Sequence, residues 1–232
     1  MTPTETFRGE RDDLDARAAA LVCEALRERA SAAPHVVLGV VGGRSVGGIY
    51  ARLKAMDLPW AKLHVFLADE RLVPVTSDES NYKLVAADLL AVPLADGRLP
   101  KNQAHAFPFD ETRADLGLSA YDEALRAVGG RFDVAVLSAG EDGHTASLFP
   151  GHPSVRAPGP GFVLVEESPK PPPRRISASR PLLERTGLGL MVFYGEGKRA
   201  ALDKFEDPST PVEQCPSKLI SLMDRSVVLC DL

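Results

Sequence analysis

Short apolar runs rich in β-branched residues alternate along the chain with longer segments of helical periodicity. The first run, His35-Val-Val-Leu-Gly-Val-Val41, is apolar at nearly every position, which is typical of a strand buried on both faces of a sheet. Ahead of it, apolar residues recur at helical spacing from Leu14 to Leu26. We expect further main strands over residues 63–67, 132–137, 188–194 and 226–230, and further helices over about 44–56, 80–91, 112–128, 197–206 and 216–223.

This alternation predicts an α/β fold: a parallel, Rossmann-like, doubly wound sheet with helices on both faces. Two short apolar stretches, residues 162–165 and 176–178, predict a small accessory β region beside that sheet. The 232 residues, 44% of them hydrophobic, are enough for one full core, so we expect a single domain over residues 1–232. Ligands bind at the carboxyl ends of the strands in such sheets, so the polar segments that follow each strand are the candidate sites.

The net charge and the cysteine content indicate which classes of partner the protein binds and in which compartment it lies. The formal net charge of −5 argues against nucleic-acid binding, which needs a basic surface, although a small anionic ligand is compatible with it. Cys23, Cys215 and Cys230 make no disulfide framework and no metal-type pair, which indicates a reducing compartment. Residues 1–13 lack the apolar core of a signal peptide, and no apolar run approaches the roughly 20 residues of a membrane span. We therefore expect a cytoplasmic protein that binds neither membranes nor nucleic acids.

A glycine pair, Gly42 and Gly43, follows the first strand and precedes Arg44 and Ser45. Glycines leave backbone N–H groups open to an anionic ligand, so this loop is a candidate anion cradle. The alternative is a plain tight turn, because the loop lacks the third glycine of a dinucleotide fingerprint and the Lys-Ser/Thr of a P-loop.

Three charged residues, Asp69, Glu70 and Arg71, follow the second strand. Charges at the end of a buried strand need solvent or partners, and the simplest interpretation is a salt bridge in an exposed loop. The functional interpretation is that the planar guanidinium of Arg71 holds an anion.

A glycine-rich loop, Gly140-Glu-Asp-Gly-His-Thr-Ala-Ser-Leu-Phe-Pro150, follows the third main strand. His144 is a candidate general base, because the ordinary pKa range of histidine suits proton transfer near neutral pH. Asp142 stands two residues earlier and could orient the imidazole, while Gly143 lets the backbone approach a ligand. The alternative is a capped helix start in which His144 is incidental. No second histidine or cysteine stands at metal-ligand spacing, so no metal is expected.

Two later segments add cations. Lys170, Arg174 and Arg175 flank three consecutive prolines, which stiffen the loop and present its cations at low entropic cost. Lys198 follows Gly197 at a helix start, where the helix dipole disfavours a cation unless an anion lies nearby.

Together these segments resemble the glucosamine-6-phosphate isomerase/6-phosphogluconolactonase family, and its 6-phosphogluconolactonase branch in particular. The resemblance covers about residues 10 to 230. The motifs that carry it are Gly42-Gly43, Asp69-Glu70-Arg71-Leu-Val-Pro74 with Ser80-Asn81-Tyr82, Gly140-Glu-Asp-Gly-His-Thr-Ala-Ser-Leu-Phe-Pro-Gly151, Ser168-Pro-Lys-Pro-Pro-Pro-Arg-Arg-Ile176, Gly195-Glu-Gly-Lys198 and Pro216-Ser217.

The first loop departs from the family pattern. That loop usually reads Ser-Gly-Gly-Ser-Thr-Pro in the family, whereas this chain has Val41-Gly42-Gly43-Arg44-Ser45-Val46. Arg44 either serves as an extra phosphate donor or crowds the site. Arg174 stands where an acidic residue is common, and Arg175 matches the arginine of the family.

The resemblance implies hydrolysis of 6-phosphoglucono-δ-lactone to 6-phosphogluconate in the pentose phosphate pathway, without a cofactor or a metal. His144 would act as general base on water, and Asp142 would hold the imidazole or bind a sugar hydroxyl. Backbone N–H groups near Gly43 or Gly143 would stabilise the oxyanion. Arg71, Arg175 and Lys198 are the candidates for anchoring phosphate and sugar. The full set of expected substrate-binding residues is Gly42, Gly43, Arg44, Asp69, Arg71, Gly143, Lys170, Arg175 and Lys198.

Two other functions fit the same scaffold. Glucosamine-6-phosphate deaminases usually have Asp-Glu-Tyr where this chain has Asp69-Glu70-Arg71, and they lack the Ser-Pro-Lys-Pro-Pro-Pro segment. Non-catalytic sugar-phosphate sensors usually carry a fused DNA-binding helix-turn-helix, for which this chain has no room. We expect a small-molecule sugar-phosphate lactone as the partner, and a monomer or a small homo-oligomer.

Overall fold

The computed structural model describes residues 4–232. Seven strands form one sheet in the order β1-β10-β9-β6-β2-β3-β5, and every neighbouring pair is parallel. These strands are β1 (Glu5–Arg8), β2 (Val36–Val40), β3 (Leu63–Leu67), β5 (Ala104–His105), β6 (Val134–Ser138), β9 (Leu188–Phe193) and β10 (Arg225–Cys230). A second sheet has the antiparallel order β4-β8-β7, with β4 (Asp69–Arg71), β7 (Phe162–Val165) and β8 (Arg175–Ala178). The α/β class with an accessory β region is thereby confirmed.

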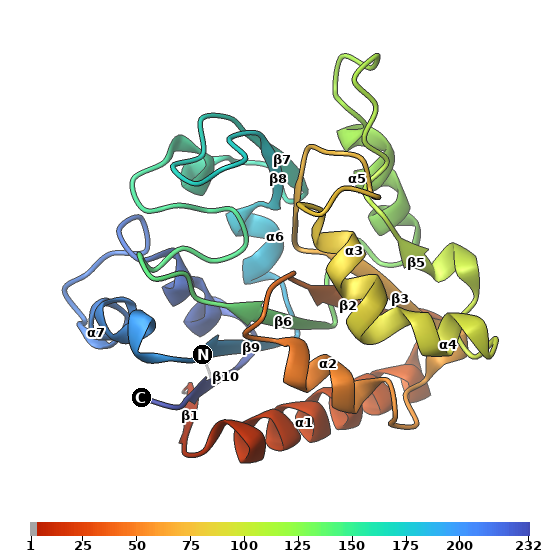
Figure 1. Cartoon of the computed structure of the whole chain (residues 1–232), viewed down its shortest axis with the longest axis horizontal. Coiled ribbons are helices and arrows are strands. Elements are labelled where there is room, and N and C mark those ends of the chain that lie inside the picture. The colour runs from red at the N-terminus through yellow and green to blue at the C-terminus, as the bar shows by residue number, and fades with distance from the viewer. Residues whose placement is uncertain (1–3) are drawn as a thin grey trace.

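Helices flank the large sheet, with α1 and α2 below it and α6 above it in Figure 1. The α-helices are α1 (Arg11–Ala32), α2 (Gly47–Leu53), α3 (Asn81–Val85), α4 (Ala91–Ala95), α5 (Leu118–Ala127), α6 (Arg180–Glu184) and α7 (Arg199–Glu206). A π-helical turn (Ala86–Leu90) joins α3 to α4, and 3-10 helices span Trp60–Lys62, Lys101–Gln103, Pro153–Arg156, Glu196–Lys198 and Pro216–Leu222.

The core lies between the sheet and its helices. Every residue of β2, β3 and β9 is buried, which is why these strands are apolar at every position except His64 in β3. In β2 a side chain at Gly39 would meet the ring of Phe132 at 2.9 Å, so the glycine makes room for that ring.

Several elements differ from the sequence-based expectation. The charged segment Asp69–Arg71 is a strand rather than a loop, and β1 and α6 were not anticipated. The helix expected from residue 112 begins at Leu118, because Leu116 and Gly117 adopt positive φ angles of 56° and 99°. The helix expected over residues 80–91 continues as the π turn and α4, and the segment near 216–223 is a 3-10 helix.

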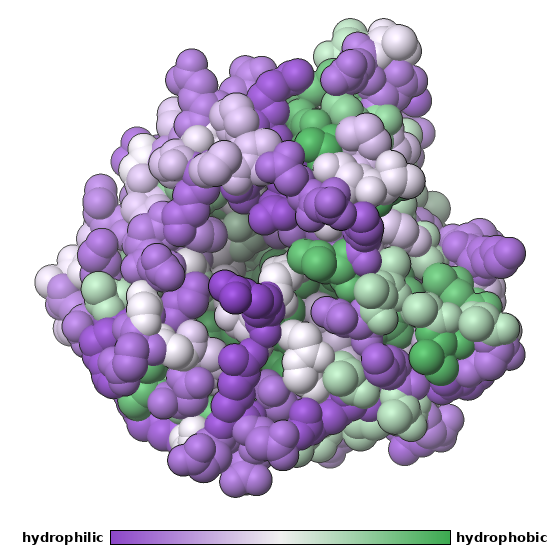
Figure 2. Space-filling view, in the orientation of Figure 1, coloured by the Kyte–Doolittle hydropathy of each residue, from purple (hydrophilic) through white to green (hydrophobic). Residues whose placement is uncertain are grey.

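The order of the strands determines where a ligand site is expected in this sheet. From β2 the chain moves to β3 and β5 on one side, and then to β6, β9 and β10 on the other. The carboxyl ends of β2 and β6 therefore flank a topological switch point, where ligands bind in open α/β sheets. The face of the molecule shown in Figure 2 is hollowed near its centre, and hydrophilic side chains border the hollow.

Candidate active site

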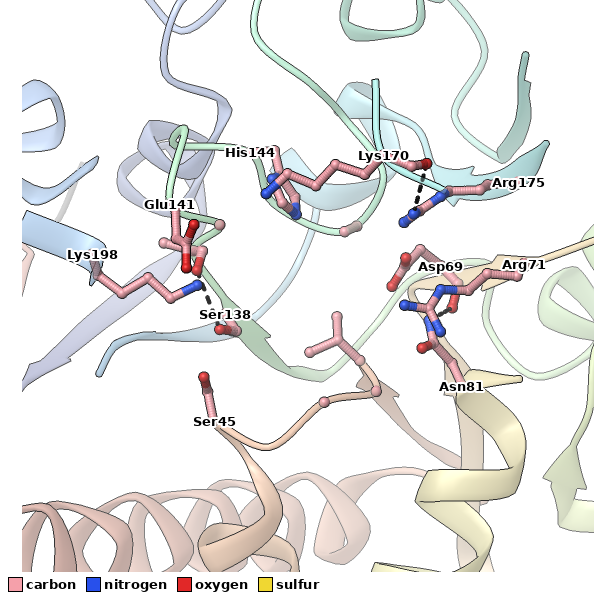
Figure 3. A pocket seen from close by; sticks show the side chains of 16 residues that line it. Ser45, Asp69, Arg71, Asn81, Ser138, Glu141, His144, Lys170, Arg175 and Lys198 are labelled. Atoms are coloured by element: carbon pink, nitrogen blue, oxygen red, sulfur yellow. Dashed lines mark hydrogen bonds between the residues drawn. The ribbon is translucent and has the colours of Figure 1, made fainter. Parts of the chain in front are cut away.

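A cavity of about 270 Å³ lies at this switch point. Its walls come from the loops after β2 and β6, from β4, from the proline-rich loop before β8 and from the turn after β9. Figure 3 shows their side chains around a shared space. The polar lining side chains are Ser45, Asp69, Arg71, Asn81, Ser138, Glu141, His144, Lys170, Arg175 and Lys198.

His144 and Asp142 form a hydrogen-bonded pair at this cavity. His144 Nδ1 lies 2.5 Å from Asp142 Oδ1, and a carboxylate acceptor assigns the proton to Nδ1. Burial alone would raise the pKa of Asp142, but the hydrogen bonds from His144, the charge that His144 carries when it is protonated and the charge of Lys170 outweigh it and hold this pKa below its ordinary value. The ionised carboxylate thus orients the imidazole and leaves Nε2 with its lone pair, which is the arrangement of a general base.

Two glycines permit close approach of functional side chains. A Cβ on Gly140 would lie 2.0 Å from the ring of His144, so any side chain there would displace the imidazole. A Cβ on Gly42 would lie 2.3 Å from Oδ1 of Asn81. Neither clash could be inferred from the sequence, because the partners are set by the fold.

The loop after β2 presents backbone donors. Gly43 has a φ of 120°, a conformation that favours glycine. Within residues 4–232, no protein group accepts the N–H of Gly42, Gly43, Arg44 or Ser45. Successive free N–H groups of this kind form a concavity that binds anions.

The three charged residues of β4 point in two directions, because they form a strand. Side chains alternate along a strand, so Asp69 and Arg71 line the cavity while Glu70 points away from it. Arg71 Nη1 donates to the carbonyl of Glu79 at 2.6 Å, and its buried Nε has no hydrogen-bond partner among the described residues. A buried donor of this kind is costly unless a ligand completes it.

Glu70 supports the site from behind. Its carboxylate accepts hydrogen bonds from the backbone N–H groups of Arg71, Asn81 and Tyr82 and from the hydroxyl of Ser80. Burial raises the pKa of Glu70, and these four bonds act in the opposite direction. Glu70 therefore joins β4 to the start of α3.

Arg175 connects the proline-rich loop to the site. Its guanidinium is nearly buried and donates to the carbonyls of Lys170, Pro171 and Pro172 at 3.1, 2.9 and 3.1 Å. Nη1 donates to Ser147 Oγ at 3.4 Å. Burial lowers the pKa of Arg175. One side chain thus anchors the loop that brings Lys170 to the cavity.

Ser147 is a connecting residue that the sequence analysis did not single out. It is fully buried, and its Oγ donates to Asp69 Oδ2 at 2.8 Å. Because it also accepts from Arg175, it connects the His144 loop to strands β4 and β8 of the small sheet.

Lys198 and Glu141 both line the cavity and lie near each other (Figure 3). Burial lowers the pKa of Lys198, while the charge of Glu141 acts to raise it. The Glu141 carboxylate reaches to 3.2 Å from where a Cβ of Gly197 would lie. The glycine before Lys198 thus leaves room for the Glu141 side chain beside the lysine.

The structure brings most of the expected residues together. Gly42, Gly43, Asp69, Arg71, His144, Lys170, Arg175 and Lys198 all line the cavity. Asp142 stands behind His144, and the N–H of Gly143 donates to the carbonyl of Gly140 within the loop.

Arg44 differs from these residues, because its side chain is exposed and lies outside the cavity lining. Ser45, Asn81, Ser138 and Glu141 line the cavity without having been proposed. Ser45, Asn81 and Glu141 lie within or beside the quoted motifs, so their position in the sequence could have identified them. Ser138 is the last residue of β6, and no motif singles it out.

Among residues 4–232 there is no cluster of three or more His, Cys, Asp or Glu side chains able to hold a metal ion. In the same part of the chain, no helix is both long and apolar enough to cross a membrane.

The pattern of a family described as glucosamine-6-phosphate isomerases/6-phosphogluconolactonase matches residues 9–229, almost the whole chain. The chain belongs to this family. A 6-phosphogluconolactonase of Caulobacter vibrioides is 34% identical over 212 residues, which is 88% of each chain. One from Borreliella burgdorferi is 28% identical over 85% of this chain and 84% of the relative. The fold of the Thermotoga maritima 6-phosphogluconolactonase matches with a TM-score of 0.84 over 99% of this chain and 100% of that one, at 21% identity.

The family description includes both isomerases and lactonases, so the choice of reaction depends on the site and on these relatives.

Proposed function

We propose that the protein hydrolyses 6-phosphoglucono-δ-lactone to 6-phosphogluconate, a step of the pentose phosphate pathway in the cytoplasm. The observation that carries the proposal is the His144–Asp142 pair, set in a cavity that also holds Arg71, Lys170, Arg175 and Lys198. A base beside several cations suits a substrate that combines an ester with a phosphate. The names of the relatives support the same reaction.

In the proposed mechanism His144 Nε2 takes a proton from water as the oxygen attacks the lactone carbonyl carbon. The imidazolium that forms is stabilised by Asp142. When the bond to the ring oxygen breaks, the imidazolium returns the proton to that oxygen, which becomes a hydroxyl group. The new carboxyl group then loses its proton to water.

The developing oxyanion needs donors that are already in place. Gly43 lines the cavity and its N–H has no acceptor among the described residues, which supports Gly43 in this role, whereas the N–H of Gly143 donates to the carbonyl of Gly140. A pre-aligned N–H group stabilises the transition state without reorganisation at the moment of reaction.

The phosphate and the sugar hydroxyls are assigned to the charged side chains. Arg71 and Arg175 reach the cavity from the small sheet, Lys170 reaches it near His144, and Lys198 reaches it beside Glu141 and Ser138 (Figure 3). Asp69 is available to a sugar hydroxyl group. Arg44, which is exposed on the loop after β2, is proposed to attract the anionic substrate from outside the cavity.

The test is acid release from freshly prepared 6-phosphoglucono-δ-lactone, followed in a pH-stat against spontaneous hydrolysis. We expect acceleration by the wild-type protein and its loss in His144→Ala. Ammonia release from glucosamine 6-phosphate, measured in parallel, tests the deaminase alternative. Equal lactone hydrolysis with and without protein would refute the proposal.

A further inference from the structure

Arg11, the first residue of α1, lies against the outer side of the loop that follows β2. Its Nη2 donates to the carbonyl of Arg44 at 2.7 Å and to the carbonyl of Ser45 at 3.4 Å. The guanidinium also lies 5.1 Å from the ring centre of Tyr194, which directly follows β9. Arg11 therefore bridges two of the segments that come from carboxyl ends of the sheet.

The position of this arginine does not favour its own helix. A cation in the first turn of a helix faces the positive end of the helix dipole, and α1 is 22 residues long. Arg11 Nε lies 4.0 Å from Oδ2 of Asp15, which offsets part of this cost. Among the described residues, the hydrogen bonds of Arg11 go to the loop and its guanidinium lies over Tyr194, so its placement serves the loop rather than α1.

The contacts of Arg11 determine where the loop's donors point. In a trans peptide the C=O and N–H groups point in opposite directions. Because the carbonyl of Arg44 faces Arg11, the N–H of Ser45 points away from that side chain, and Ser45 is one of the residues that line the cavity. Among the described residues nothing accepts that N–H, whereas the N–H of Val46 donates to Gly43 at 3.4 Å and closes the turn.

Apart from the bond between Val46 and Gly43, no hydrogen bond within the loop holds the Arg44–Ser45 peptide among the described residues. Residues 41–46 contain no proline, and Gly43 adopts a φ that other residues rarely adopt. Helix α2, which follows the loop, packs closely on α1, because Asp15 Oδ2 lies 1.9 Å from where a Cβ of Gly48 would be. A salt bridge of 2.5 Å between Asp12 and Arg52 adds to the contact of α1 with α2.

We propose that Arg11 is a positioning residue of the active site, which holds the Arg44–Ser45 peptide so that the N–H of Ser45 joins that of Gly43 in facing the oxyanion. This inference rests on the proposed lactone hydrolysis for its kinetic consequence, but its structural content is independent. Arg11 touches no substrate; it acts through the orientation of one peptide group.

The kinetic test compares Arg11→Gln with Arg11→Lys and with the control Arg17→Gln. Arg17 lies on the same helix with its guanidinium 4.3 Å from the ring centre of Phe7, away from the loop. Since misdirecting one oxyanion donor is less severe than removing it, we expect Arg11→Gln to lower kcat about tenfold. KM should change less than twofold, because the donor acts on the transition state.

The lysine variant tests whether a single donor suffices. Both hydrogen bonds to the loop come from one nitrogen of Arg11, so Arg11→Lys should keep kcat within about threefold of the wild type. The proposal is overturned if Arg11→Gln matches Arg17→Gln in kcat, if only KM rises, or if lysine is as slow as glutamine.

A second measurement needs no turnover. In ¹H–¹⁵N spectra, addition of 6-phosphogluconate, whose carboxylate occupies the place of the oxyanion, should shift the amide of Ser45 in the wild type and in Arg17→Gln. In Arg11→Gln the shift should be lost. If the protein shows these shifts but has no lactonase activity, the proposed function is refuted and the positioning role of Arg11 is not. An unchanged Ser45 response in Arg11→Gln would refute the role of Arg11.

Discussion

Replacement of Asp142 by asparagine tests the central feature of the site, the support that a carboxylate gives to His144. The amide keeps the size and one acceptor oxygen, but it removes the negative charge that stabilises the imidazolium formed during proton transfer. Two unit charges about 4 Å apart interact by about 4 kcal/mol at an effective dielectric constant of about 20. The Asp142 side chain is 34% exposed, and solvent screening at that exposure reduces the figure to about 2 kcal/mol.

A loss of about 2 kcal/mol corresponds to a decrease in kcat of about 30-fold. KM should stay within about twofold, because the charge is needed mainly in the transition state. The assay is acid release from 6-phosphoglucono-δ-lactone at constant pH, over a range of substrate concentrations. Asp203→Asn, an exposed carboxylate on α7, is the matched control.

Two results for Asp142→Asn would contradict the proposed role of Asp142. If kcat falls less than threefold, the carboxylate does not stabilise a charged His144, and the general-base mechanism is wrong in that respect. If KM rises while kcat is unchanged, Asp142 binds a sugar hydroxyl instead.

Three further substitutions test the other parts of the site. His144→Ala should lower kcat by about 10²–10⁴, the usual contribution of a general base, with a smaller change in KM; near-normal turnover would remove His144 from the mechanism. Arg71→Ala should reduce kcat/KM by roughly 2–4 kcal/mol, because it removes a charge-assisted contact with the phosphate; equal wild-type activity on unphosphorylated gluconolactone would contradict that role. Arg44→Ser should weaken substrate binding by less than Arg71→Ala and most strongly at low salt, where screening is least; a higher kcat/KM would show that the arginine obstructs the site.

The sequence by itself determined the class of fold and the edge of the sheet at which the site lies. Runs such as residues 35–41 are apolar at nearly every position because both faces of a parallel strand are covered, and this pattern is local. The helical segments between such runs require parallel connections, so the polar loops after the strands collect at one edge. That reasoning placed His144, Arg71 and Lys198 in one cavity, as the structure has them.

Only the tertiary structure decided which side chains face that cavity and what holds them. Asp69–Arg71 becomes a strand because it pairs with β8, more than 100 residues later, and this pairing separates Glu70 from its two neighbours. The outward position of Arg44 and the bond from Arg11 to its carbonyl depend on where α1 packs. Contacts between residues far apart in the chain leave no periodic signal in the sequence, because each depends on the geometry of elements that the fold brings together.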